Sequence, residues 1–182
     1  MPGKRNHNAA SLADKALVHP ANEQRRAYES LGRIEILEGA LAGSPFVDVT
    51  ALANLAQQQL GADNPRNAAD LLRCAEHLCF AALAPAHVTD SLMNPELKRA
   101  ITVEFETLMR RAEEQWQKEE PANRHVIEDI YARALDQARR AFTRGAFRPA
   151  LEFARAGEAL SCLREGLPAT LPDRGLTGRL AS

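Results

Sequence analysis

Cys74, His77 and Cys79 form the densest group of metal-ligating residue types in this chain. Cys74 and His77 are three positions apart, so in a helix they share one face, where a thiolate and an imidazole can bind zinc. Cys79 follows Cys74 by five positions and points elsewhere, and no second paired Cys/His motif supplies further ligands. We therefore predict no metal and no other cofactor, and we interpret the cysteines as small buried apolar residues with free thiols.

Other catalytic patterns are missing from the sequence. A carboxylate-bridged di-metal centre in a helical bundle needs a glutamate three positions before a histidine, and none of the five histidines has one. The chain also lacks a glycine-rich phosphate loop, a Gly-x-Ser-x-Gly elbow and a His-Glu-x-x-His helix. These absences favour a protein that is not an enzyme.

Arginines near the end of the chain are the candidate binding residues. They lie along one predicted helix and at the start of the next: Arg133, Arg140, Arg144 and Arg148. Such a row could follow a phosphate backbone. However, Asp129 precedes Arg133 by four positions and Asp136 precedes Arg140 by four, an order that favours ion pairs within a helix, worth about 0.2–0.5 kcal/mol each. The spacing therefore favours a solvated face and disfavours nucleic acid as the partner.

The composition predicts that helices carry these residues. Alanine and leucine supply 56 residues, valine and isoleucine only 11, and aromatic residues 9. Alanine and leucine lose little freedom in a helix, whereas sheets are enriched in β-branched and aromatic side chains. We expect an all-α fold without a sheet.

Capping and breaking residues divide the chain into about six helices. The first is expected from Ala21, because His19-Pro20 disfavours helix before it. Asp48 or Thr50 is predicted to cap the second, and Asn64-Pro65 and Asn94-Pro95 open the third and fourth with an asparagine cap and a proline in the first turn. Asn123 is predicted to cap the fifth, and Gly145 separates it from the sixth.

An internal duplication relates the two halves of this series. Residues 66–78 align with residues 148–160 at an offset of 82, and residues 28–33 align with residues 105–110 at an offset of 77. The first alignment matches Arg73 with Arg155 and Glu76 with Glu158, each pair separated by three positions. Each pair could bridge within its helix or reach across to the other half. We predict a bundle made of two three-helix units, each a long helix followed by a hairpin.

The second hairpin resembles two families of helical proteins. Gly145, Phe147 and Ala150 match the inter-helix turn of a tetratricopeptide hairpin, although the 34-residue period of such an array is absent. Residues 138–163, with their small side chains, Glu158 and short turn, are similar to the hairpins of HEPN proteins, which include ribonucleases and nucleotide-binding toxins.

The catalytic signature of HEPN ribonucleases is an arginine, four to six residues, and a histidine. Here only three residues separate Arg73 from His77, and His125 directly follows Arg124. The HEPN resemblance therefore implies an RNA- or nucleotide-binding protein without ribonuclease activity.

These patterns predict the following organisation. We expect a polar arm at 1–20, one all-α domain at 21–166 with repeat units at about 21–84 and 95–166, and a loosely ordered tail at 167–182. No apolar run is long enough to span a membrane and the polar start is unlike a signal peptide, so we expect a cytoplasmic protein. Grooves between Ala-rich hairpins suit a partner helix or a second copy of the chain, and an interaction or regulatory module is our first hypothesis.

Overall fold

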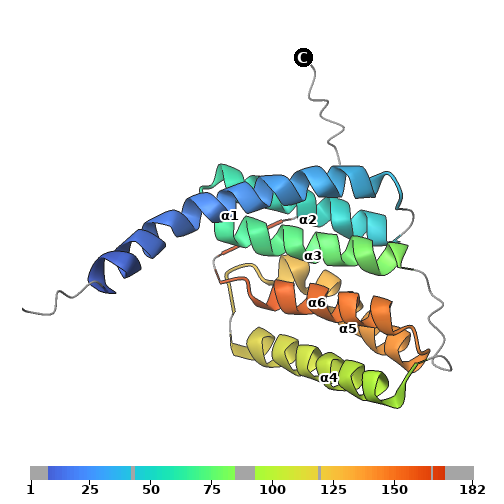
Figure 1. Cartoon of the computed structure of the whole chain (residues 1–182). Helices are drawn as coiled ribbons and strands as arrows, with labels where there is room; N and C mark the ends of the chain where they lie inside the picture. The colour runs from blue at the N-terminus through green and yellow to red at the C-terminus, as the bar shows by residue number, and fades with distance from the viewer. Residues whose placement is uncertain (1–7, 42–43, 85–92, 119, 165, 171–182) are drawn as a thin grey trace, which may run out of the picture.

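The computed structural model consists of helices throughout the residues that it describes, which are 8–41, 44–84, 93–118, 120–164 and 166–170 (Figure 1). The helices are α1 (Asn8–Glu38), α2 (Ser44–Gly61), α3 (Pro65–Leu83), α4 (Pro95–Lys118), α5 (His125–Thr143) and α6 (Phe147–Ser161). No strand occurs in these ranges. The predicted all-α bundle of about six helices is confirmed. None of the described helices is long and apolar enough to cross a membrane.

Two helices, α3 and α6, form the centre of the bundle. α3 packs against α1 and α2, α6 packs against α4 and α5, and α3 and α6 pack against each other. Figure 1 shows α1, α3, α6 and α4 in that order from top to bottom, with α2 and α5 behind them. Leu71, Leu72 and Leu160 are among the fully buried side chains of these two central helices. α3 and α6 thus join α1 and α2 on one side of the bundle to α4 and α5 on the other.

The asparagine-proline signatures predicted two helix starts correctly. α3 begins at Pro65, and the Asn64 side chain accepts a hydrogen bond from the backbone N–H of Asn67. α4 begins at Pro95, and the Asn94 side chain accepts a hydrogen bond of 2.8 Å from the backbone N–H of Glu96. Each side chain satisfies a donor that the first helical turn leaves unpaired.

The expected start of the first helix is wrong. α1 begins at Asn8 and continues through Pro20, so much of the predicted polar arm is helical and extends beyond the other helices at the left of Figure 1. Proline removes one backbone hydrogen bond, but strong helix-forming residues on both sides continue the helix. Residues 1–7 of the predicted arm lie outside the described part of the chain.

The predicted tail begins too early, and the predicted cap at Asn123 is also wrong. Leu167 is buried, its backbone N–H donates to the carbonyl of Ala122, and the Asn123 side chain donates to the Leu167 carbonyl at 2.7 Å. α5 starts two residues after Asn123, at His125. The Asn123 amide therefore holds the segment after α6 against the α4–α5 loop, a contact between residues 44 positions apart. Residues 171–182 lie outside the described part of the chain.

Candidate functional site

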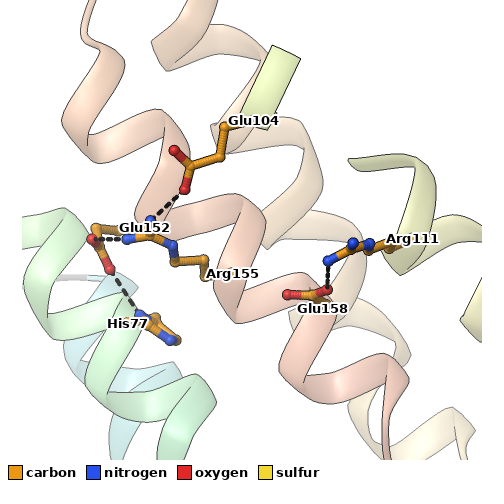
Figure 2. Close-up of polar contacts among 6 residues, drawn as sticks. All are labelled: His77, Glu104, Arg111, Glu152, Arg155 and Glu158. Carbon is orange, nitrogen blue, oxygen red and sulfur yellow. Dashed lines mark hydrogen bonds and ion pairs between the residues drawn. The ribbon is translucent and has the colours of Figure 1, made fainter. Parts of the chain in front are cut away.

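A chain of polar contacts links α3, α6 and α4 at the centre of the molecule. His77 Nδ1 lies 2.7 Å from Glu152 Oε2, and Arg155 donates to the other oxygen of Glu152 at 2.8 Å and to Glu104 at 2.6 Å. Figure 2 shows these side chains converging from three helices. The His77–Glu152 contact joins the two halves of the chain across 75 positions.

The charges around Glu152 determine its protonation. Burial raises the pKa of this carboxyl group, but the hydrogen bond and charge of His77, and then the contacts with Arg155, lower it by more. The net effect is a lowered pKa, so at neutral pH Glu152 is ionised and accepts the hydrogen from His77 Nδ1. An ionised carboxylate can only accept a hydrogen bond, so Nδ1 is the donor of His77 in this contact.

Glu152→Gln should reduce the free energy of unfolding by about 1 kcal/mol at neutral pH, because a neutral amide accepts weaker hydrogen bonds than a carboxylate. A lowered folded-state pKa stabilises the protein above the unfolded-state value and loses that effect as pH falls through the folded-state value. The difference between wild type and variant should therefore shrink below the ordinary pKa of 4.5. Urea unfolding at pH 7, 5 and 3 measures it.

The matched control is Glu104→Gln, because Glu104 contacts the same Arg155 but is more exposed. We expect it to change the free energy of unfolding by less than about 0.5 kcal/mol. A Glu152→Gln effect of equal size at pH 3 and pH 7 would contradict an origin in charge.

The repeat-matched residues do not form the predicted pairs within their helices. Arg73 pairs with Asp70 and Arg155 pairs with Glu152, in each case with an acid three positions earlier. Glu76 pairs with Arg33 of α1, and Glu158 with Arg111 of α4, at 2.5 and 3.9 Å. Each glutamate therefore reaches the first helix of its own half. Glu76, Glu158 and Arg155 connect helices, whereas Arg73 pairs within α3.

The four candidate binding arginines fall into two groups. Arg133 lies on α5 and donates two hydrogen bonds, of 3.1 and 2.8 Å, to the carboxylate of Asp48 on α2 rather than to Asp129. Arg140 forms the expected ion pair with Asp136 at 2.8 Å. Arg144 and Arg148 are exposed, and neither forms an ion pair within the part of the chain that the structure describes.

Arg148 and several exposed apolar side chains lie at the same end of the bundle. The charge of Asp70 helps to raise the pKa of Cys162, so these two residues lie near each other, and His77 contacts Glu152. The start of α3 therefore lies near the end of α6, and α3 runs antiparallel to α6. The contacts of Arg155 with Glu104 and of Glu158 with Arg111 show that α4 runs parallel to α6. The end of α3, the start of α4 and the start of α6 therefore lie together, at the right of Figure 1.

We call this region the apolar end surface and define it by five residues: Phe80, Leu83, Leu97, Arg144 and Arg148. Phe80, Leu83 and Leu97 are 44%, 42% and 52% exposed. Arg148 is in the first turn of α6 and Arg144 directly follows α5. Sequence periodicity could not find this surface, because its members come from three helices and the α5–α6 turn, whose directions only the fold shows.

The Cys/His group does not form a metal site. Cys74 and Cys79 are fully buried, and burial raises the pKa of the Cys74 thiol well above its usual value. Across the residues that the structure describes, no cluster of three or more His, Cys, Asp or Glu side chains could hold a metal ion. His77 instead faces Glu152, a partner that its sequence neighbours do not reveal.

The fold and these contacts define a class of protein, an all-α bundle whose central helices are tied to their neighbours by ion pairs. Comparison with models of known families, with characterised proteins and with solved structures finds no match to this chain. The function must therefore be argued from the residues themselves.

Proposed function

We propose that this chain is a non-enzymatic protein-interaction module, and that its apolar end surface binds an acidic amphipathic helix of a partner protein. One observation carries the proposal: three large apolar side chains are about half exposed at the same end of the bundle as two arginines that have no ion pair among the described residues. Scattered single apolar side chains are normal on a surface, but several large ones exposed at one end of a bundle support an interaction site.

The apolar part of this surface supplies affinity. Completing the burial of Phe80, Leu83 and Leu97 would contribute on the order of 1 kcal/mol for each, about half of what full burial of such a side chain contributes. A helix presents apolar residues at spacings of three and four, and such a row suits a surface bordered by two helices.

The charged part of this surface selects the partner. Arg144 and Arg148 are exposed, whereas Arg133, Arg140 and Arg155 already pair with acids of this chain. An acidic partner would compensate the two remaining guanidinium charges, and complementary charge favours both association rate and specificity.

A displayed library of helical 20-residue peptides with randomised surface positions tests this proposal. Selected peptides should combine an apolar row with an excess of Asp and Glu, and their affinity should fall at least tenfold with Leu83→Glu or Arg148→Glu. Both positions are exposed, so these variants should fold. Val103→Ser is the control, because Val103 is exposed on α4 outside the apolar end surface. Peptides without acidic enrichment, or with unchanged affinity for both variants, would contradict the proposal.

Two other occupants are outcomes of the same experiment. If a 20-nucleotide RNA binds at low salt, loses affinity steeply as salt rises and depends on Arg144 and Arg148, the surface belongs to nucleic acid and the proposal fails. If light scattering shows a dimer that Leu83→Glu converts to a monomer, a second copy of the chain occupies the surface and the proposal also fails.

A further inference from the structure

A hollow between α4 and α5 lies away from the apolar end surface. Its volume is about 360 Å³, and it is lined by Glu113, Trp116, Gln117, Glu128, Tyr131, Ala132, Leu135 and Arg139. Trp116 and Tyr131 stack with ring centroids 3.8 Å apart, and the guanidinium of Arg124 lies 4.6 Å from the centre of the Trp116 ring. The stacked rings form one wall of the hollow, and Ala132 and Leu135 add aliphatic surface beside them.

The Tyr131 hydroxyl is a polar group without a partner in this wall. Tyr131 is 7% exposed, and its hydroxyl oxygen is buried and forms no hydrogen bond. Burial, and then the nearby charge of Glu113, raise its pKa to about 12, while Arg139 and Arg124 act in the opposite direction. The phenol is therefore neutral at pH 7 and can both donate and accept. Buried polar groups almost always have partners, so this hydroxyl can take a hydrogen bond from a ligand that reaches it.

The charges around the hollow favour a cation. Glu113 on α4 and Arg139 on α5 form an ion pair with each other. Glu128 is exposed in the first turn of α5 and forms no ion pair with any described residue. It also lines a second hollow of about 400 Å³ around the α4–α5 loop, where Glu120 pairs with Arg124. The carboxylate of Glu128 is thus the charge that remains uncompensated between the two hollows.

We propose that this hollow binds a small alkylammonium ion. The ammonium group would donate to the Tyr131 hydroxyl and to the carboxylate of Glu128, and the alkyl chain would lie against Ala132, Leu135 and the edge of Trp116. The half-exposed side chains of Glu113 and Arg139 would move aside to admit it, since both are long and flexible. A carboxylate ligand fits less well, because Arg139 is already paired and Glu128 would repel it.

Trp116 makes a direct test available, because it is the one tryptophan of the chain. Titration with n-pentylammonium should change its fluorescence saturably, with a Kd on the order of 1 mM for a ligand of this size. Pentan-1-ol and pentanoate, of similar shape but without positive charge, should bind at least tenfold more weakly. An equal response to all three compounds would overturn the proposal.

Single substitutions test whether n-pentylammonium binds in this hollow. Tyr131→Phe and Glu128→Gln should each weaken n-pentylammonium at least tenfold, and unchanged affinity in both would also overturn the proposal. Glu114→Gln is the matched control, because Glu114 is an acid of α4 that pairs with Arg110 at 3.1 Å and does not line the hollow. It should bind like the wild type.

Without ligand, Tyr131→Phe should raise the Tm by about 2–4 °C, because it removes a buried hydroxyl that has no partner. This rise shows that the variant is folded, so weaker binding cannot be attributed to unfolding. A lower Tm would show that the hydroxyl already has a partner in the free protein, and would contradict the premise of the site.

Discussion

Gly157→Val should lower the free energy of unfolding by about 3 kcal/mol, the upper part of the range for overpacking a core. Gly157 is buried on the side of α6 that faces α5, where an added Cβ would lie 2.5 Å from Leu135 Cδ2. The Cβ of valine carries two further methyl groups, and a β-branched residue has few allowed rotamers in a helix. The Tm should fall by roughly 6–12 °C in a chain of this size, measured by thermal unfolding.

Gly157→Ala is the informative comparison. Its single methyl group meets the end of the Leu135 side chain, which can rotate, and alanine favours a helix over glycine by about 1 kcal/mol. We expect a change within about 1 kcal/mol of wild type. In a Leu135→Ala background the obstruction is gone, so Gly157→Ala should become stabilising by about 1 kcal/mol. If Gly157→Val were as stable as wild type, the close packing of α5 on α6 would be wrong.

Gly157 is one of the small residues in the alignment of the two halves of the chain. Ala75 aligns with Gly157 at the offset of 82, and both are fully or nearly fully buried. Small residues at such buried positions allow neighbouring helices to approach closely. The helix count and several boundaries followed from the same local signals, because caps, prolines and periodicity act over a few residues.

The features that the sequence could not predict all depend on contacts between distant segments. Leu167 looked like the start of a tail, but the Asn123 side chain holds it. Asp48 looked like a helix cap, yet α2 begins at Ser44 and Asp48 lies one turn inside it, where it accepts hydrogen bonds from Arg133. Local spacing predicts Asp129 as the partner of Arg133, and only the fold, which brings Asp48 within hydrogen-bond distance of Arg133, decides between the two acids.

In the candidate sites, too, the sequence identified individual residues but not the contacts between distant segments. The sequence identified His77, Arg155 and the α5 arginines as the residues to consider, but it could not pair His77 with Glu152 or place Arg148 at the same end of the bundle as Phe80. These relations depend on the register and direction of α3 relative to α6. The Trp116–Tyr131 stack was missed for a similar reason, because its two rings come from α4 and α5, whose relative register the sequence does not give.

Arg133→Met should lower the free energy of unfolding by about 2 kcal/mol. Asp48 is 8% exposed and accepts two charge-assisted hydrogen bonds from Arg133. Removing one partner of a fully buried pair costs about 3–5 kcal/mol, because the other charge is left without compensation. The Arg133 side chain is 48% exposed, so water can approach the Asp48 carboxylate in the variant and the loss is smaller. Urea unfolding at pH 7 measures the difference.

Further variants distinguish a structural role of Arg133 from a role in binding. Arg133→Lys keeps the charge but loses the two-pronged geometry, and should fall between wild type and Arg133→Met. Asp48→Leu combined with Arg133→Met removes both charges and should recover at least half of the lost stability. RNA affinity, if any exists, should not change with Arg133→Met, because the guanidinium is already bound to Asp48. Arg133→Met with the stability of wild type but weakened RNA binding would reverse this assignment and return Arg133 to the row of phosphate-binding arginines.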